Sequence, residues 1–557
     1  MTTVQRSFYF IFALLFAAGM HYYQYNYGGV GLTAPFNLMT WGFVSILIGL
    51  GLWHCSQNGE IYYSPLLVAT SLFVASLFIP ILYSNNELLI HSTQRLIGLT
   101  AGLAFLFSLY QINLPVEKWH KLIPWIQVGI IIEGGICFTQ QYVFPDTVWM
   151  QHNPNLRPSG IFQQPNVIST FAVMGIALAT FNLAFNKHTS KIEQYIINLA
   201  GLVAAWIIML NTSRTATIAL FIVLIGTAPL LYRQANRAHL RHWYYAILLG
   251  LAIPLILNLM DSTFKPREIV ENIRPTLYFI SLGLIAKNLL TGVGYGGFSV
   301  NFHQAQAEYI ETHEFSKEQF ANNAAHPHNE VLLWGVEGGL LPLISFVILF
   351  IFVGYRYLAL GWRKGIFYLS IIFPAAFHSM TELPFYHAAI VFITFTFTAY
   401  MIEKSAFIEK KTTLPQALNF KLTALIIPAL TLCFTLTGLH TLNRLRHFQQ
   451  TGHSDMTYLQ EIINPIAISE TIDYAWLTSP LLTNRQNTES IERFIAATEQ
   501  KLNYWPRARL YQDLATAYQL QGNQERANSV YREGKRLFPF NQKFNSIEDN
   551  LIELSTP

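Results

Sequence analysis

The sequence predicts an all-α membrane protein with about thirteen transmembrane helices and a helical C-terminal tail. Hydrophobic residues make up 52% of the 557 residues and charged residues only 12%, whereas a soluble protein carries about twice that share of charge. The apolar residues fall in runs of roughly 18 to 22, long enough to cross a bilayer as helices. Because lipid offers no hydrogen-bond partner to a bare peptide group, such runs must be helical.

The candidate spans follow one another from the N-terminus to residue 440. The first run, behind Arg6, could be mistaken for a signal peptide, but similar runs follow it and we interpret it as the first span. The expected spans are residues 8–26, 37–53, 65–83, 95–113, 122–143, 166–185, 194–211, 214–232, 243–260, 331–354, 365–383, 385–402 and 421–440.

The net charge and the cysteines argue against several other classes of protein. A formal charge of +4 is too small to indicate nucleic-acid binding. The three cysteines, Cys55, Cys137 and Cys433, lie in or beside apolar runs and show neither metal-ligand spacing nor the even number typical of a disulfide framework. We therefore expect a lipid bilayer, and no nucleic acid or metal, among the partners of the chain.

Lysine and arginine residues in the short loops predict the orientation. They collect in alternate loops, which contain Lys118, Lys121, Lys187, Lys191, Arg233, Arg237, Arg241, Arg356, Arg363, Lys364, Lys404, Lys410 and Lys411. The opposite short loops contain little beyond Arg157 and Arg214. Since basic loops stay in the cytoplasm, we expect a cytoplasmic N-terminus, a transmembrane domain over residues 1–440 and an external tail over residues 441–557.

A long external loop at residues 261–330 interrupts the alternation of spans. Within it, residues 276–290 are apolar but too few to cross a bilayer, and a cluster of glycines follows at positions 292, 294, 296 and 297. We interpret this segment as a helix that lies on or dips into the membrane and ends in a glycine turn. Residues 308–323 are polar and are expected to form a surface helix.

The tail has the pattern of a tetratricopeptide unit at about residues 508–541. The spacing is carried by Tyr511, Leu514, Ala515, Tyr518, Gly522, Ala527, Tyr531 and Pro539. A generic helical hairpin is the alternative, and an expected helix at about residues 487–503 matches the repeat only weakly. A single unit cannot bury its own apolar face, so we expect it to dock on neighbouring helices or on a partner.

Ionisable residues at the membrane boundary are candidates for function, and the first candidate is the sequence His-Pro-His-Asn-Glu at positions 326–330. Pro327 suits the first turn of a helix. His328 would then lie at a helix N-terminus, whose positive end favours the neutral imidazole of a general base. A structural histidine is the alternative. Zinc binding by His326 and His328 is a further one, but no third ligand is evident.

Three arginines are candidates for binding an anion on the same external side. Arg214 lies in a tight turn between two spans, where a phosphate group would suit its planar guanidinium and ordinary snorkelling is the alternative. Arg157 precedes the span at 166–185 and can be either a ligand or a loop anchor. Lys265, Arg267 and Arg274 lie at the start of the long loop, where a solvated charge is the more common role for any single one of them. Arg274, next to Pro275 and the short apolar helix, is the candidate that we select.

Together these residues fit the displacement of a pyrophosphate leaving group. Arginine would offset the charge on the leaving oxygen, and the histidine would take a proton from the attacking hydroxyl. The external loops contain no convincing aspartate-rich metal motif, which favours a metal-independent reaction without a cofactor.

These motifs resemble those of the O-antigen ligase and polymerase superfamily (Wzy C-terminal) and, within it, the bacterial protein (pilin) O-oligosaccharyltransferases. The resemblance covers most of the membrane part. It rests on Arg-Pro-Ser-Gly-Ile-Phe at 157–162 with Pro165 and Asn166, on Thr-Ser-Arg at 212–214, and on His328 and Asn329 followed by two glycines at 338–339.

The resemblance implies a GT-C-like glycosyltransferase of the bacterial inner membrane that uses an undecaprenyl-pyrophosphate-linked oligosaccharide and acts in the periplasm. His328 matches the essential histidine of the family. Arg214 matches an arginine that holds the pyrophosphate, and Arg274 is the match for a second, with Arg157 as a further candidate. The resemblance assigns no role to His326, and we place it with Asn329 and Glu330 as supporting residues.

The span at 421–440 and the long tail resemble the protein-glycosylating branch, for which a Ser or Thr of a pilin-like protein is the acceptor. An O-antigen ligase acting on lipid A–core, or an O-antigen polymerase, is the alternative within the same chemistry. A transporter or flippase is an alternative of another class, but the sequence shows no internal repeat of the kind common in transporters.

Overall fold

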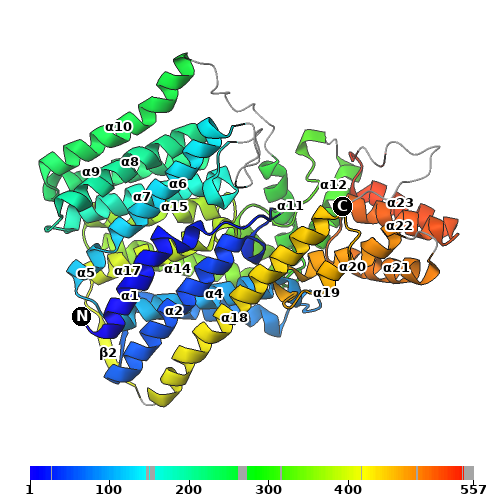
Figure 1. The fold of residues 1–557 in the computed structure, drawn as a ribbon, viewed down its shortest axis with the longest axis horizontal. Coiled ribbons are helices and arrows are strands. Elements are labelled where there is room, and N and C mark those ends of the chain that lie inside the picture. The colour runs from blue at the N-terminus through cyan, green and yellow to red at the C-terminus, as the bar shows by residue number, and fades with distance from the viewer. Residues whose placement is uncertain are drawn as a thin grey trace. The chain divides into compact units, whose positions relative to one another are not determined.

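The computed structural model describes residues 1–26, 28–145, 150, 157–260, 273–313, 317–414, 417–483, 487–541 and 544. This part of the chain is mostly helical and contains one pair of short strands (Figure 1). Twelve of its helical segments are long and apolar enough to cross a membrane. The prediction of an all-α polytopic membrane protein is confirmed.

The helices of the apolar part keep the order that the sequence predicts. They are α1 (Thr3–Ala17), α2 (Pro35–Asn58), α3 (Pro65–Phe78), α4 (Thr93–Ile112), α5 (Val116–His120), α6 (Ile123–Phe138), α7 (Pro165–Phe185), α8 (Lys191–Asn211), α9 (Arg214–Gln234), α10 (Arg237–Met260), α14 (Leu340–Leu358), α15 (Trp362–Ser379), α16 (Pro384–His387), α17 (Ala389–Ala406) and α18 (Ala417–Gln450). The span expected at 365–383 corresponds to α15, which contains Pro374 and is not among the twelve.

The chain divides into two compact units. Unit 1 comprises Met1–Val74, Gly98–Glu268 and Ile348–Asn443, and unit 2 comprises Ala75–Ile97, Ile269–Val347 and Arg444–Pro557. The tail therefore belongs to the same unit as the long loop that precedes α14.

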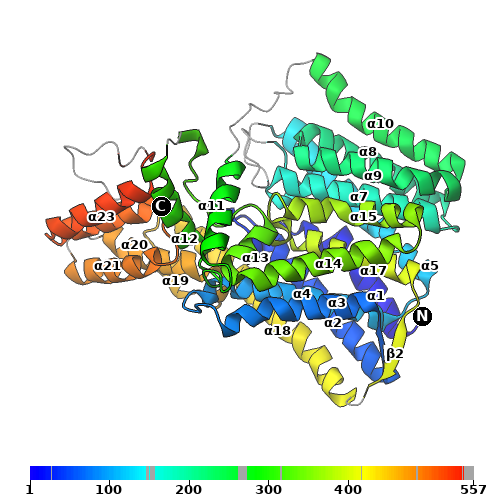
Figure 2. The ribbon, with the colours of Figure 1, turned by 180° about the vertical axis from the view of Figure 1, so that it is seen from behind.

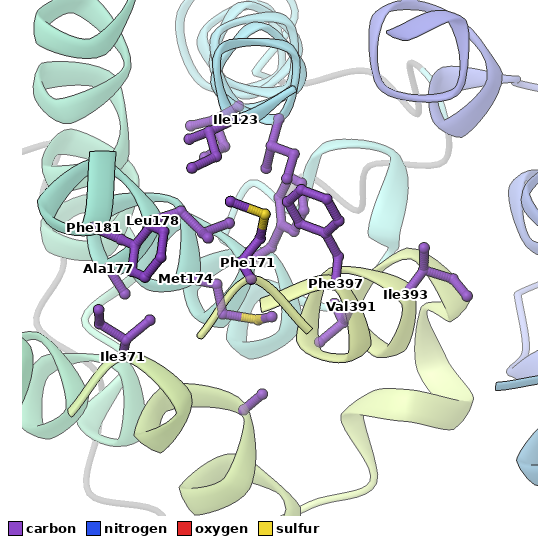
Figure 3. Packing of buried hydrophobic residues seen from close by; sticks show 14 of the residues in the cluster. Ile123, Phe171, Met174, Ala177, Leu178, Phe181, Ile371, Val391, Ile393 and Phe397 are labelled. Atoms are coloured by element: carbon purple, nitrogen blue, oxygen red, sulfur yellow. The ribbon is translucent and has the colours of Figure 1, made fainter. Parts of the chain in front are cut away.

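The core of unit 1 forms around α7, whose candidate span is buried along its whole length. This helix packs against α6, α8, α9, α15 and α17, and α7, α8 and α9 lie side by side (Figure 1, Figure 2). Its apolar side chains face Ile371 of α15 and Phe397 of α17 (Figure 3). A helix that is apolar on all sides is stable only when it is buried in this way or surrounded by lipid.

Two short strands join loops that are far apart in the sequence. Strand β1 (Glu60–Tyr63) pairs antiparallel with β2 (Lys410–Thr413), with Glu60 opposite Thr413. Two loops that pair in this way lie on one side of a membrane, so an even number of crossings must separate them. Nine of the twelve candidate spans lie between the strands, so the pairing favours α15 as a further crossing.

Unit 2 contains α11 (Arg274–Lys287), α12 (Phe298–Thr312) and α13 (Glu330–Gly338), and α11 contacts both of the others. Helix α11 corresponds to the short apolar helix expected at 276–290 and is not among the candidate spans. Residues 261–272 and 314–316 of the expected loop, with Lys265 and Arg267, lie outside the described residues.

Two expectations for this region were wrong. The span expected at 331–354 is broken into α13 and α14 at Gly339. The φ of Gly339 is +76°, a backbone conformation that glycine adopts without steric cost. A Cβ atom at this position would also lie 2.7 Å from the carbonyl oxygen of Leu290. The surface helix expected at 308–323 is instead α12, which begins at Phe298 and ends at Thr312. Its buried residues Phe298, Phe302 and Ala307 form an apolar helical face.

The tail contains α19 (Thr457–Gln460), α20 (Ser469–Thr483), α21 (Thr488–Leu502), α22 (Ala508–Leu520) and α23 (Gln524–Leu537), and the last three lie side by side (Figure 1). Helices α21 to α23 enclose a small core that includes Phe494 and Leu514. A second core joins α23 to α12, where Leu537 and Phe538 contact Ala307 and Phe320. The apolar face of the hairpin is thus covered by the loop helix.

His303 of α12 is a buried histidine in the contact between α12 and the tail. Its imidazole is buried, donates from Nδ1 to the carbonyl oxygen of Ser299 at 2.8 Å, and lies 5.1 Å from the ring of Phe538. Burial lowers the pKa of His303 to about 4. An unfolded histidine binds a proton below about pH 6.5, so unfolding is favoured increasingly as the pH falls from about 6.5 to about 4.

We expect the thermal unfolding temperature of unit 2 to fall between pH 7 and pH 4.5, with faster proteolysis of the tail. A His303→Gln variant, which has no proton to bind, should lose part of this dependence. An equal pH dependence in the variant and the wild type would contradict the assignment to His303.

Candidate functional site

His328 occupies a constrained turn in unit 2, directly before α13. Its φ is +53°, an uncommon value for a residue with a side chain. Its backbone N–H donates to Nδ1 of His326 at 3.2 Å, and the two rings lie 4.5 Å apart, edge to face. Its carbonyl oxygen accepts from the hydroxyl of Tyr278 on α11 at 3.4 Å. Neighbouring groups thus support a backbone conformation that is otherwise costly.

The residues after His328 begin α13. Asn329 is the N-cap, and its side chain accepts from the backbone N–H of Leu332 at 3.0 Å, which satisfies a donor that the helix leaves free. Glu330 accepts from the indole N–H of Trp334 at 2.8 Å. Pro327 is not in the first turn as expected, because the helix begins only at Glu330. His328 nevertheless lies next to the positive end of α13.

Arg274 is the first residue of α11, one turn before Tyr278. Residues four apart lie on one face of a helix, so Arg274 shares a face with the tyrosine that contacts the carbonyl group of His328. Two of the candidates that are far apart in the sequence are therefore connected through α11.

The structure also shows a buried ion pair that the sequence reasoning missed. The guanidinium of Arg95, on α4, pairs with the carboxylate of Glu337 on α13 and lies 4.3 Å from the ring centroid of Trp334. Glu337 also accepts from the backbone N–H of Gly296 at 3.1 Å. The pair therefore attaches α13 to the glycine turn and to α4. In the sequence, Arg95 and Glu337 are each a single charged residue within an apolar run, but nothing in the sequence predicts that the two form an ion pair.

In unit 1, Arg157 anchors a loop. Its guanidinium donates to the carbonyl oxygen of Asn211, the last residue of α8. Two side chains bind the backbone of the loop that follows. Glu133 accepts from the N–H group of Ile161 at 3.0 Å, and Gln140 accepts from the N–H group of Gly160 at 2.9 Å. These contacts fit the role of a loop anchor, and the role of Arg157 as a ligand stays a prediction.

Arg214 is exposed and is the first residue of α9. The turn before it contains Thr212 with a φ of +44°, and the flanking Asn211 and Ser213 are buried. The contact between Arg157 and Asn211 brings both arginines to this turn. The free N–H groups of a helix N-terminus beside an exposed guanidinium form a surface suited to an anion.

A polar network next to this turn was also missed. His378 of α15 is hydrogen-bonded through Nδ1 to the hydroxyl of Thr170 at 2.8 Å and through Nε2 to Glu382 at 3.1 Å. The side-chain amide of Asn166 donates to Glu382 at 3.1 Å. The network joins the end of α15 to the start of α7 and explains the position of Asn166 in its motif. The only feature of the sequence that pointed to this network is the presence of polar residues within apolar runs.

Two segments match families of known proteins. Residues 199–347, which contain Arg214, Arg274 and His328, match the O-antigen ligase family. Residues 366–550, which extend from α15 through the tail, match a family described as the C-terminal region of a virulence factor membrane-bound polymerase. A search of curated proteins gives no match.

The matches support the O-antigen ligase superfamily and, with the candidate spans, indicate a multi-pass inner-membrane protein. They further support a transferase of the glycosyl-transfer or ligase type.

Proposed function

We propose that this chain is a bacterial protein O-oligosaccharyltransferase. It transfers an oligosaccharide en bloc from undecaprenyl pyrophosphate to a Ser or Thr hydroxyl of a pilin-like protein in the periplasm. We choose a protein as the acceptor because the helical tail docks on α12, within the unit that contains His328. A tail fixed beside the catalytic loop gives a protein acceptor a surface on which to bind.

In this reaction His328 takes the proton of the acceptor hydroxyl, and the oxygen forms a bond to the anomeric carbon of the oligosaccharide. The bond from that carbon to the pyrophosphate oxygen breaks, and undecaprenyl pyrophosphate leaves. Arg214 and Arg274 offset the negative charge that develops on the leaving group. An imidazole can accept a proton of this kind as a general base.

The periplasmic placement of the site is supported by the charges at the two ends of α9. Arg214 begins this helix and Arg233 lies in its last turn, in one of the basic loops that we assign to the cytoplasm. Strands β1 and β2 join two further loops of the same alternate set, one of them with Lys410 and Lys411. Arg214 and the turn around it then face the periplasm.

An O-antigen ligase that transfers to lipid A–core is the second candidate. The match of residues 199–347 to the O-antigen ligase family favours it directly. The proton transfer and the leaving group would be the same, and only the acceptor would differ.

A deletion strain separates the two candidates when its pilin-like protein and its lipopolysaccharide are analysed together. We expect the protein to lose the mass of the oligosaccharide by intact mass spectrometry, and the O-antigen ladder to persist. Re-expression of the wild-type chain should restore the sugar. Loss of the ladder with an unchanged protein mass would overturn the proposal in favour of the ligase.

A further inference from the structure

The tail and α12 together form a groove of about 740 Å³ in unit 2. Four helices contribute to its wall, namely α12, α21, α22 and α23. Its apolar part includes Val300, Leu514 and Val530. The groove is large enough for several residues of an extended chain, and Figure 2 shows the tail helices that surround it.

The polar part of the groove is rich in side-chain amides. Gln304 of α12 and Gln500 and Asn503 at the end of α21 line it, with Ser529 of α23 beside them. These four side chains are exposed, and within the described part of the chain none of them forms a hydrogen bond. An amide side chain has both donors and an acceptor, so it matches the N–H and C=O groups of a peptide backbone.

The charge of the groove is negative. Among the described lining residues the charged ones are Glu499 and Glu533. Arg536 pairs with Glu533 at 2.9 Å, whereas Glu499 accepts a hydrogen bond from the neutral hydroxyl of Tyr518 at 2.6 Å. The Glu499 carboxylate is therefore available for a cationic side chain. The same carboxylate would repel the phosphate groups of a lipid A–core acceptor.

We propose that this groove binds an extended segment of the acceptor protein that carries a Lys or Arg. The amides bind the backbone of the segment, the apolar wall accepts its alternate side chains and Glu499 pairs with its basic residue. This inference rests on the proposed function and specifies the acceptor's binding surface. The bound segment lies against α12, in the unit that contains His328.

The test uses the full-length chain in nanodiscs, with the undecaprenyl-pyrophosphate-linked oligosaccharide and a purified pilin-like protein as substrates. We expect Glu499→Lys, and separately the double variant Gln500→Ala with Asn503→Ala, to raise the KM for the protein by about tenfold or more. The kcat and the KM for the lipid-linked donor should stay unchanged. Glu492→Lys and Gln521→Ala are matched controls, since Glu492 is exposed on α21, Gln521 is exposed directly after α22, and neither lines the groove.

The outcomes separate this inference from the proposed function. If the wild type transfers sugar to the protein and the groove variants have the wild-type KM, the groove is not the binding surface and the function stands. A lower kcat with an unchanged KM would likewise overturn the inference, because it indicates a structural role. If the wild type transfers no sugar to the protein, the proposed function fails and the inference fails with it.

Discussion

Replacement of His328 by alanine is expected to lower glycan transfer by about 10²- to 10⁴-fold, the usual contribution of a general base. The acceptor hydroxyl then has no imidazole at position 328 to take its proton as it attacks. The measurement is the rate of sugar transfer to the acceptor by purified variants, with the amount of folded protein determined in parallel.

A second variant of His328 is needed, because alanine can disturb the backbone at this position as well as remove the imidazole. Its φ of +53° is strained for alanine, whereas asparagine adopts this conformation readily. His328→Asn should therefore keep the turn and still lose activity. His326→Ala is the neighbouring control and should retain much more activity. Wild-type rates in His328→Asn would show that His328 is not the base.

Removal of the carboxylate of Glu337 is expected to destabilise the protein by about 3 to 5 kcal/mol, the usual cost of leaving the partner of a buried pair uncompensated. The side chains of Arg95 and Glu337 are 9% and 4% exposed, so water cannot replace the lost carboxylate. Glu337→Ala also removes the acceptor of the Gly296 N–H group. The change should appear as a lower thermal unfolding temperature in detergent, with less protein in the membrane.

An exposed ion pair provides the matched control. Glu489 and Arg493 lie on α21 with side chains 71% and 74% exposed, and exposed pairs contribute at most about 1 kcal/mol. Glu489→Ala should therefore leave the unfolding temperature almost unchanged. A similar small effect of Glu337→Ala would mean that the buried pair does not hold α13 in place.

The helical framework was predictable because span length is set by the bilayer. Apolar runs identified twelve helical segments that can cross a membrane, with errors mainly at their ends. The break at Gly339 was missed because the run of apolar residues continues on both sides of it. The two glycines at 338–339 were the local signal for a turn. The close approach of Gly339 to the carbonyl group of Leu290 depends on tertiary structure and could not be predicted.

The candidate site was predictable only where a residue carries its own signal. His328 and Arg214 stand out because charged or polar side chains are costly at a membrane boundary. The contact of Tyr278 with the carbonyl group of His328 joins segments with a long loop between them. The network of His378, Glu382 and Asn166 likewise joins α15 to α7, and no local pattern relates them. The roles of the candidate residues themselves remain predictions.

The core that joins α12 to the tail determines when the molecule can be completed during biosynthesis. Ala307 and Phe320 are translated well before Leu537 and Phe538, their partners in this core, and three further candidate spans are made in between. The apolar face of α12 therefore stays uncovered until the end of the chain has emerged and folded. A nascent or prematurely terminated chain would expose this face, and exposed apolar surface of this kind promotes aggregation and recognition by chaperones. The unit with His328 can therefore complete this core only after residues 537 and 538 have been made.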